Sequence, residues 1–212
     1  MESKSFFAAS GSLPELKIRV IPGHFSTSRS HVNFYLDMTE IKSGLFPARK
    51  AAQALAFPFF GRLTETIVCL DGTEVIGALL AENLSGCGMG GINRGLPIHI
   101  LTPEITAAGQ FLLRRDTIPE IDGKSALILA ASVTTGQTIR QAAECTRYYG
   151  GNVSGAAAIF SLLNKMDDFP IFSIFGAEDF PGYQTYPGTD CPLCRKGVRI
   201  DAIINQSGYA KL

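Results

Sequence analysis

The distribution of apolar residues along the chain predicts an alternation of strands and helices. Residues 126–131 form a continuous run of small and branched apolar side chains, which is typical of a buried strand, and residues 139–149 show helical spacing. A short polar turn that contains three threonines, residues 133–138, joins these two segments. A strand, a tight turn and a helix in this order are a building unit of α/β proteins.

The remaining segments extend this pattern in both directions. We expect a half-exposed strand at residues 17–21 that ends at Pro22 and Gly23, preceded by a loose start over residues 1–16. The other expected elements are a strand at 31–38, a helix at 45–60, a strand at 65–70, a helix from 75 to about 83, and strands at 96–101, 152–161 and 169–175. The sequence therefore predicts an α/β fold with a parallel core sheet and helices on both of its faces.

Two connections differ from ordinary loops. Residues 85–95 are glycine-rich and contain a G-x-G-x-x-G spacing at Gly86, Gly88 and Gly91. This segment follows an expected helix, whereas a dinucleotide-binding fingerprint follows a strand, so we interpret it as a flexible connection. Residues 102–123 are long enough to form a mobile lid that closes over an active site.

Composition narrows the class of protein. The chain has 212 residues, which suits one domain with a substantial core, and 46% of them are hydrophobic against 18% charged. Lys plus Arg and Asp plus Glu both number 19, so no net charge attracts nucleic acid or an anionic membrane, and we expect neither as a partner. No apolar stretch reaches the length of a membrane span and no secretion signal is evident, which predicts a cytoplasmic protein.

The polar turn has the features of an anion site. Thr134, Thr135 and Thr138 offer hydroxyl groups, and Gly136 lets the backbone approach a ligand. Gln137 follows this glycine, where the first turn of the expected helix has N–H groups without partners inside the helix. Two interpretations remain open, namely a phosphate-binding turn and an ordinary connection whose threonines only cap the helix.

A second turn between a strand and a helix is acidic. Its residues are Asp71, Gly72, Thr73 and Glu74, directly after the strand expected at 65–70. Ligands of parallel sheets collect at the carboxyl ends of the strands, so this turn and the threonine-rich turn would share one ligand. A pyrophosphate is compatible with Asp71 and Glu74 when Mg²⁺ lies between the charges. The alternative is a helix start capped by Asp71 or Thr73.

Residues 126–138 resemble the 5-phosphoribosyl-1-diphosphate (PRPP) signature of type I phosphoribosyltransferases. That signature has two hydrophobic residues, two adjacent acids, two hydrophobic residues and then Thr-Thr-Gly-x-Thr/Ser, and residues 133–138 match its second half. The acids hold the ribose hydroxyls in the family, and Ala130 and Ala131 stand at their positions. The resemblance implies that residues 134–138 bind the 5-phosphate and that residues 71–74 bind the pyrophosphate together with Mg²⁺.

Two other segments are similar to bacterial orotate phosphoribosyltransferases. Residues 31–38 resemble a strand of their substrate hood, and the Cys-Pro-Leu-Cys run at 191–194 resembles the C-terminal segment of one branch. The resemblance implies a homodimer and a single domain over residues 1–212. Its hood would consist of about residues 17–44 and 180–212, and its core of about residues 45–179.

Two functions remain open. The resemblance implies transfer of ribose 5-phosphate from PRPP to a pyrimidine-type base, with loss of pyrophosphate, in nucleotide biosynthesis or salvage. The alternative is a sensor or regulatory paralogue that binds PRPP or another 5-phosphorylated ribose ligand without turnover. The alanines at 130 and 131 favour this alternative. The expected lid favours it too, because it lacks the lysine and histidine of the family and has only Arg114 and Arg115 as basic candidates.

The cysteines indicate reduced thiols. Cys69 and Cys145 fall in segments that we expect to be buried, and Cys87 lies among glycines, which does not suit a disulfide framework. Cys191 and Cys194 form a Cys-x-x-Cys pair, which is half of a structural zinc site. No second such pair follows, so a local turn with reduced thiols is favoured over zinc shared with a distant Cys or His.

Overall fold

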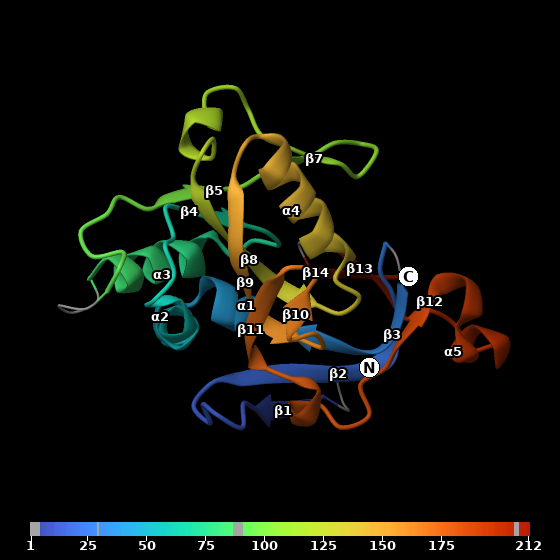
Figure 1. Ribbon diagram of the computed structural model, residues 1–212. Helices are drawn as coiled ribbons and strands as arrows, with labels where there is room; N and C mark the ends of the chain where they lie inside the picture. The colour runs from blue at the N-terminus through green and yellow to red at the C-terminus, as the bar shows by residue number, and fades with distance from the viewer. Residues whose placement is uncertain (1–4, 29, 87–90, 206–207) are drawn as a thin grey trace.

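The core sheet is built from the most apolar segments of the chain. The computed structural model describes residues 5–28, 30–86, 91–205 and 208–212, and it orders the core strands β10-β11-β9-β8-β4-β5 (Figure 1). The parallel strands are β4 (Thr66–Cys69), β5 (His99–Leu101), β8 (Ser125–Val133), β9 (Asn152–Ser161) and β11 (Phe169–Phe175). The short strand β10 (Lys165–Met166) pairs antiparallel with β11.

Helices cover both faces of this sheet. The helices α2 (Leu45–Ala56) and α3 (Glu74–Gly86) pack on one face, and α4 (Gln137–Tyr148) packs on the other. Strand β8 serves both cores, because Leu127 and Leu129 belong to the cluster with α2 and α3 whereas Ala126 and Ile128 belong to the cluster with α4. Strands covered on both faces need apolar side chains at successive positions, which explains the continuous apolar run in the sequence. The predicted α/β class with a parallel core sheet is confirmed.

A second six-stranded sheet, which we call the hood, joins the two ends of the chain (Figure 1). Its strands are β1 (Phe6–Ala9), β2 (Lys17–Ser26), β3 (Ser30–Asp37), β12 (Thr185–Pro187), β13 (Ala202–Asn205) and β14 (Gly208–Lys211). Strand β12 pairs antiparallel with β3, and β13 runs parallel to β2, so the C-terminal segment lies on both sides of the β2–β3 hairpin. Buried aromatic residues, including Phe25 and Tyr35, give the hood a small core of its own.

Short elements complete the chain. They are the helices α1 (Thr39–Ser43) and α5 (Pro192–Arg195), the 3₁₀ turns η2 (Phe57–Phe59), η3 (Ile118–Glu120), η4 (Ala177–Asp179) and η5 (Gly188–Asp190), and the hairpin of β6 (Glu104–Ile105) and β7 (Phe111–Leu112). The hairpin and η3 occupy the connection that we expect to act as a lid.

Two local expectations were wrong. The loose start contains strand β1, which pairs with β2 in register from Phe6 opposite Val20. Strand β2 also continues past Pro22 to Ser26, because a register shift between Pro22 and Phe25 takes up the extra residue. A bulge of this kind tolerates proline inside a strand, since the proline does not have to donate a ladder hydrogen bond there.

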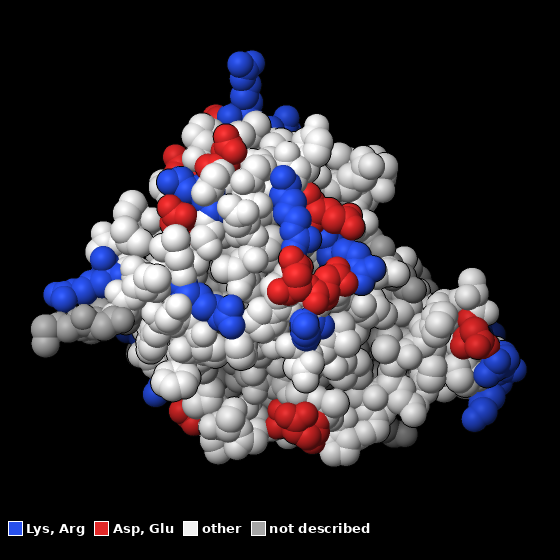
Figure 2. All heavy atoms as spheres, viewed as in Figure 1, with Lys and Arg blue, Asp and Glu red and all other residues white. Residues whose placement is uncertain are grey.

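Three further features are the glycine-rich connection, membrane-spanning segments and the surface charge. The predicted flexible connection covers residues 85–95. Its residues 87–90, which include Cys87, lie outside the described residues. Among the described residues, no helix is both long and apolar enough to cross a membrane. Figure 2 shows acidic and basic side chains interspersed on the visible face. Arg140 and Arg147 of α4 form ion pairs with Asp167 and Asp168.

Candidate functional site

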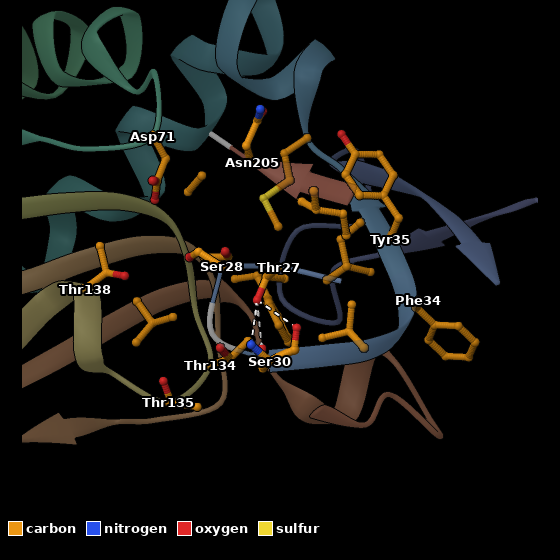
Figure 3. Close-up of a pocket in the computed structure, with 18 of the residues that line it drawn as sticks. Thr27, Ser28, Ser30, Phe34, Tyr35, Asp71, Thr134, Thr135, Thr138 and Asn205 are labelled. Atoms are coloured by element: carbon orange, nitrogen blue, oxygen red, sulfur yellow. Dashed lines mark hydrogen bonds between the residues drawn. The ribbon is translucent and has the colours of Figure 1, made fainter. Parts of the chain in front are cut away.

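A cavity of about 250 Å³ lies where the carboxyl ends of the core strands meet the hood. The core contributes the acidic turn after β4 through Asp71 and the whole of residues 131–139 after β8. The hood contributes the β2–β3 loop, the inner part of β3 and the β13–β14 end, and Figure 3 shows this loop facing the threonine-rich turn. Two turns that are far apart in the sequence thus share one pocket.

The threonine turn, residues 134–138, is held in shape by Gly136. This residue has φ 77° and precedes the first residue of α4, and no side chain caps the helix. A Cβ atom at position 136 would lie 1.9 Å from Met166 Cε, so a larger residue requires the Met166 side chain to move. Thr134, Thr135, Gly136, Gln137 and Thr138 all line the cavity. The first N–H groups of a helix, together with threonine hydroxyls, are suitable donors for a phosphate.

The two alanines before this turn lie in different surroundings. Ala131 is 7% exposed and lines the cavity. Ala130 is fully buried and packs in the cluster on the α4 side of the sheet. Successive residues of a strand point to opposite faces, so only position 131 can present a side chain to a ligand in the cavity.

The acidic turn contributes one carboxylate to the cavity. Asp71 lies there with φ 57°, and its carboxylate accepts a hydrogen bond from the N–H of Ala131. Burial raises the pKa of this carboxyl, an effect that the Ala131 N–H and the Lys42 ammonium only partly oppose. Asp71 is the one acidic side chain among the described residues that line the cavity.

The other residues of the acidic turn lie outside the cavity lining. The Thr73 hydroxyl is buried and donates to the carbonyls of Leu70 and Leu129, at 2.8 Å and 3.2 Å. Glu74 accepts a hydrogen bond of 3.0 Å from the Thr102 hydroxyl. Gly72 is exposed and has φ 74°. Thr73 therefore holds the turn against β8, while Asp71 faces the ligand space.

Lys42 is a cavity residue that the sequence analysis missed. It lies on α1, and its Nζ donates to the Asp71 carbonyl at 2.9 Å. It is the one Lys or Arg among the described residues lining the cavity. Neither a motif nor its spacing distinguishes this lysine, because its position depends on how α1 packs beside the acidic turn.

The hood side of the cavity is both polar and aromatic. Thr27, Ser28 and Ser30 face the threonine turn, and the Thr27 hydroxyl donates to the Ser30 carbonyl at 2.9 Å (Figure 3). Tyr35 also lines this side, and burial raises its pKa to about 12, so it remains a neutral phenol. Asn205 of β13 adds an amide from the C-terminal segment. Hydroxyl-rich residues between two expected strands are the signal that could have identified the loop.

The two lid candidates, Arg114 and Arg115, lie outside the cavity lining. Arg114 is exposed and makes a two-bond ion pair with Glu104, across the β6–β7 hairpin. Arg115 is also exposed, and neither residue belongs to the cavity lining.

The Cys-x-x-Cys pair lies outside the cavity lining, next to two histidines of the hood. His24, His31, Cys191 and Cys194 place one potential ligand atom each within 4.8 Å of one another. Sequence spacing does not connect the two cysteines with these histidines, because the histidines are far away in the sequence and reach the cysteines only through the hood sheet.

Comparisons with known proteins identify relatives of this chain but no matching family model. No family model matches the chain. The orotate phosphoribosyltransferase of Heliobacterium modesticaldum is 28% identical over 189 residues, which cover 84% of this chain and 87% of the relative. The orotate phosphoribosyltransferase of Wolinella succinogenes is 28% identical over 195 residues, with coverages of 85% and 88%.

Solved structures show the same fold. A phosphoribosyltransferase from Corynebacterium diphtheriae superposes with a TM-score of 0.54 at 19% identity, over 76% of this chain and 89% of that chain. The Mycobacterium tuberculosis orotate phosphoribosyltransferase in complex with PRPP gives a TM-score of 0.52 at 14% identity, over 68% and 82%. The chain therefore has the fold of a type I phosphoribosyltransferase. Its curated relatives are bacterial orotate phosphoribosyltransferases, so the resemblance stated from the sequence is confirmed.

Proposed function

We propose that the protein binds PRPP in the cavity between core and hood, and that it is an orotate phosphoribosyltransferase-like enzyme. The observation that carries this proposal is the convergence of the threonine turn and Asp71 on one cavity. The reaction would transfer ribose 5-phosphate to a pyrimidine-type base and release pyrophosphate, as the names of the relatives suggest.

The 5-phosphate is assigned to residues 134–138. A phosphate here meets the N-terminal end of α4, where the backbone N–H groups and the helix dipole both favour a negative charge. The hydroxyls of Thr134, Thr135 and Thr138 can add donors to the same anion. Since Gly136 has no side chain, nothing at the cap position competes with the ligand for these groups.

The diphosphate is assigned to the side of Asp71. Mg²⁺ is commonly bound by one or two carboxylates together with the phosphates of the substrate, and a single lining carboxylate fits this arrangement. When bound, the metal ion would neutralise charge on the leaving pyrophosphate. Lys42 would supply a second positive charge close to Asp71. In this proposal Gly72, Thr73 and Glu74 act by holding the turn.

The base is assigned to the hood side. Tyr35 offers an aromatic ring, and Ser30 and Asn205 offer donors and acceptors for the edge of a pyrimidine. A base with a carboxylate, such as orotate, would need a cation, and Lys42 is the one that the described lining provides. Transfer requires the base and the ribose to meet between the hood and the two core turns, which is the geometry of this cavity.

We further propose a single-domain homodimer that works in the cytoplasm. Phe46 and Phe57, near the two ends of α2, are 75% and 77% exposed, and large apolar side chains at the surface favour contact with a second copy. The lid residues Arg114 and Arg115 would then contribute charge to a site only after the lid moves.

A second function is favoured by a specific observation. Ala131 stands where the family has a carboxylate that holds the ribose hydroxyls, and no acidic side chain other than Asp71 is found in the described cavity lining. A protein with the phosphate site but without this carboxylate could bind a 5-phosphorylated ribose ligand and not turn it over. It would act as a sensor or as a regulatory partner of an active relative.

An assay of pyrophosphate release separates the two functions. The protein is incubated with PRPP, Mg²⁺ and orotate, and then with other pyrimidine and purine bases. Release that requires both PRPP and a base, and that is lost in Asp71→Asn but kept in the surface variant Asp168→Asn, supports the transferase. PRPP binding without release for any base contradicts the transferase and supports the second function. Absence of PRPP binding contradicts the transferase, and absence of binding of both PRPP and ribose 5-phosphate contradicts both functions.

A further inference from the structure

Four side chains from three segments of the hood converge behind the cavity loop. His24 lies on β2, His31 lies on β3, and Cys191 and Cys194 lie at the start and within the single turn of α5. We propose that these four residues bind one zinc ion, which fixes the C-terminal segment to the β2–β3 hairpin. This proposal does not depend on the function of the cavity.

Four of the six distances between the ligand atoms lie within or slightly below the range of a tetrahedral zinc site. His24 Nε2 lies 3.0 Å from His31 Nδ1, 3.5 Å from Cys191 Sγ and 3.7 Å from Cys194 Sγ, and Cys194 Sγ lies 3.3 Å from His31 Nδ1. A tetrahedron with zinc–nitrogen distances of about 2.0–2.1 Å and zinc–sulfur distances of about 2.3 Å has edges of about 3.3–3.8 Å. The ligand set Cys₂His₂ is one of the common structural sets for zinc.

Hydrogen bonding accounts for only part of the contacts in this cluster. His24 Nδ1 lies 2.9 Å from the Val198 carbonyl, which can only accept, so Nδ1 is the donor. In the neutral ring, Nε2 of His24 then has a single lone pair, although His31, Cys191 and Cys194 all approach it. A cation at the centre instead uses one lone pair from each of the four atoms.

The surroundings of His24 also match those of a metal ligand. The second ring nitrogen of a ligating histidine commonly donates to a carbonyl, which fixes the tautomer and the direction of the ring, and Val198 provides this carbonyl. Two hydrogen bonds also hold the His24 backbone to Asp201 of the C-terminal segment. The His24 N–H donates to Asp201 Oδ2 at 2.8 Å, and the His24 carbonyl accepts from the Asp201 N–H at 2.7 Å. His24 and Cys191 are buried, with 1% and 2% of their surfaces exposed.

The bulge in β2 explains how the two histidines reach one face of the sheet. Between the pairs Pro22–Phe34 and Phe25–Val32, β2 has two residues where β3 has one. A bulge of this kind redirects the side chains that follow it. His24 thereby lies beside His31, with ring centroids 5.0 Å apart. Cys191 and Cys194, which are one helical turn apart, supply the other two ligands.

The proposed metal has a structural role next to the cavity. All four tetrahedral positions are occupied by protein side chains, which is typical of structural sites and leaves no position for a substrate. None of the four residues lines the cavity, but the loop between the two histidines contributes Thr27, Ser28 and Ser30 to it. Zinc would therefore hold this loop and the β13 strand in place relative to each other.

Metal analysis tests the proposal directly. The full-length protein is purified without a histidine tag from zinc-supplemented cells, dialysed, and analysed by mass spectrometry for metal content. We expect about one zinc per chain. The variant Cys194→Ser should lose most of the zinc, whereas Cys145→Ser, which removes a thiol on α4 outside the cluster, should keep it. Zinc-free wild type that does not take up added zinc would overturn the proposal, as would equal zinc content in all three proteins.

Two further measurements keep the test independent of folding defects in a variant. Cobalt added to zinc-free wild type should give the visible absorption of a tetrahedral site with thiolate ligands, and Cys145→Ser should give the same spectrum. Removal of zinc by a chelator should lower the Tm and speed amide hydrogen exchange in residues 24–31 and 191–202. An octahedral cobalt spectrum, or a Cys191–Cys194 disulfide in protein purified under reducing conditions, would contradict zinc binding.

Discussion

At the residue scale, the proposed phosphate site depends on hydroxyl groups as well as on the helix end. The Thr135 side chain is exposed at the cavity wall, so Thr135→Val removes one donor without disturbing the core. A hydrogen bond to a charged group contributes about 1.5–3 kcal/mol, so affinity for a 5-phosphorylated ligand should fall by about tenfold or more. Calorimetry of ribose 5-phosphate binding measures this, with Thr106→Val in the β6–β7 hairpin as control. Equal affinity in both variants would argue against the assignment.

The two alanines before the turn should respond differently to an added carboxylate. Ala131→Asp places the group at the cavity, and we expect tighter PRPP binding in the presence of Mg²⁺, because the ribose hydroxyls gain an acceptor. Ala130→Asp places the same group in the core on the α4 side, which should lower the free energy of unfolding by more than about 3 kcal/mol. Denaturant unfolding and PRPP titration of both variants test this difference. Tighter PRPP binding in Ala130→Asp, together with a large loss of stability in Ala131→Asp, would show that the register of the motif is wrong.

Asp71 should make stability depend on pH. Burial raises the pKa of its carboxyl in the folded protein above that in the unfolded chain, so the folded state holds its proton more tightly. The free energy of unfolding should therefore fall as pH rises from the ordinary aspartate pKa through the raised value. Asp71→Asn removes this loss and should be more stable than wild type at neutral pH but not in acid. Urea unfolding across this pH range, without added Mg²⁺, checks the trend; parallel curves for the two proteins would contradict it.

At the element scale, the start of α4 depends on glycine for two reasons. Gly136→Ala must adopt φ 77° and also place a Cβ atom against Met166. The backbone strain costs about 1–2 kcal/mol, and overpacking adds about 1–3 kcal/mol. Gly109→Ala is a matched control, because its φ is 78° but no atom lies within 4 Å of the added Cβ. Thermal unfolding should show a larger loss for Gly136→Ala; equal losses would mean that Met166 moves aside freely.

The order of core elements was predictable from the sequence because each has a strong periodic signal. The apolar run of β8, the threonine turn and the helical spacing of α4 are local patterns, and they predicted the turn that lines the cavity. Strand β1 and the continuation of β2 past Pro22 were not predictable in this way, because pairing with a neighbouring strand decides both. The lid connection also contains a hairpin, and its two-residue strands are too short to show an alternation of apolar and polar residues in the sequence.

At the scale of the whole molecule, the site is formed by docking the hood onto the core. Lys42 reaches the cavity from α1, and Tyr35 and Asn205 reach it from the hood strands β3 and β13, so no single local motif could bring the three residues together. The same holds for the metal cluster, in which His24 and His31 meet Cys191 and Cys194 from the other end of the chain. Sequence motifs located the core half of the site, whereas the hood half required the three-dimensional structure.

The measurement that tests the central claim most directly is a calorimetric titration of the full-length protein with PRPP, with and without Mg²⁺. Ribose 5-phosphate serves as the control ligand, since it offers the 5-phosphate but no diphosphate. We predict PRPP binding that tightens with Mg²⁺, because Asp71 and the diphosphate would share the ion, and weaker, Mg²⁺-independent binding of ribose 5-phosphate at the threonine turn. Absence of PRPP binding under both conditions would contradict the assignment of this cavity as a PRPP site.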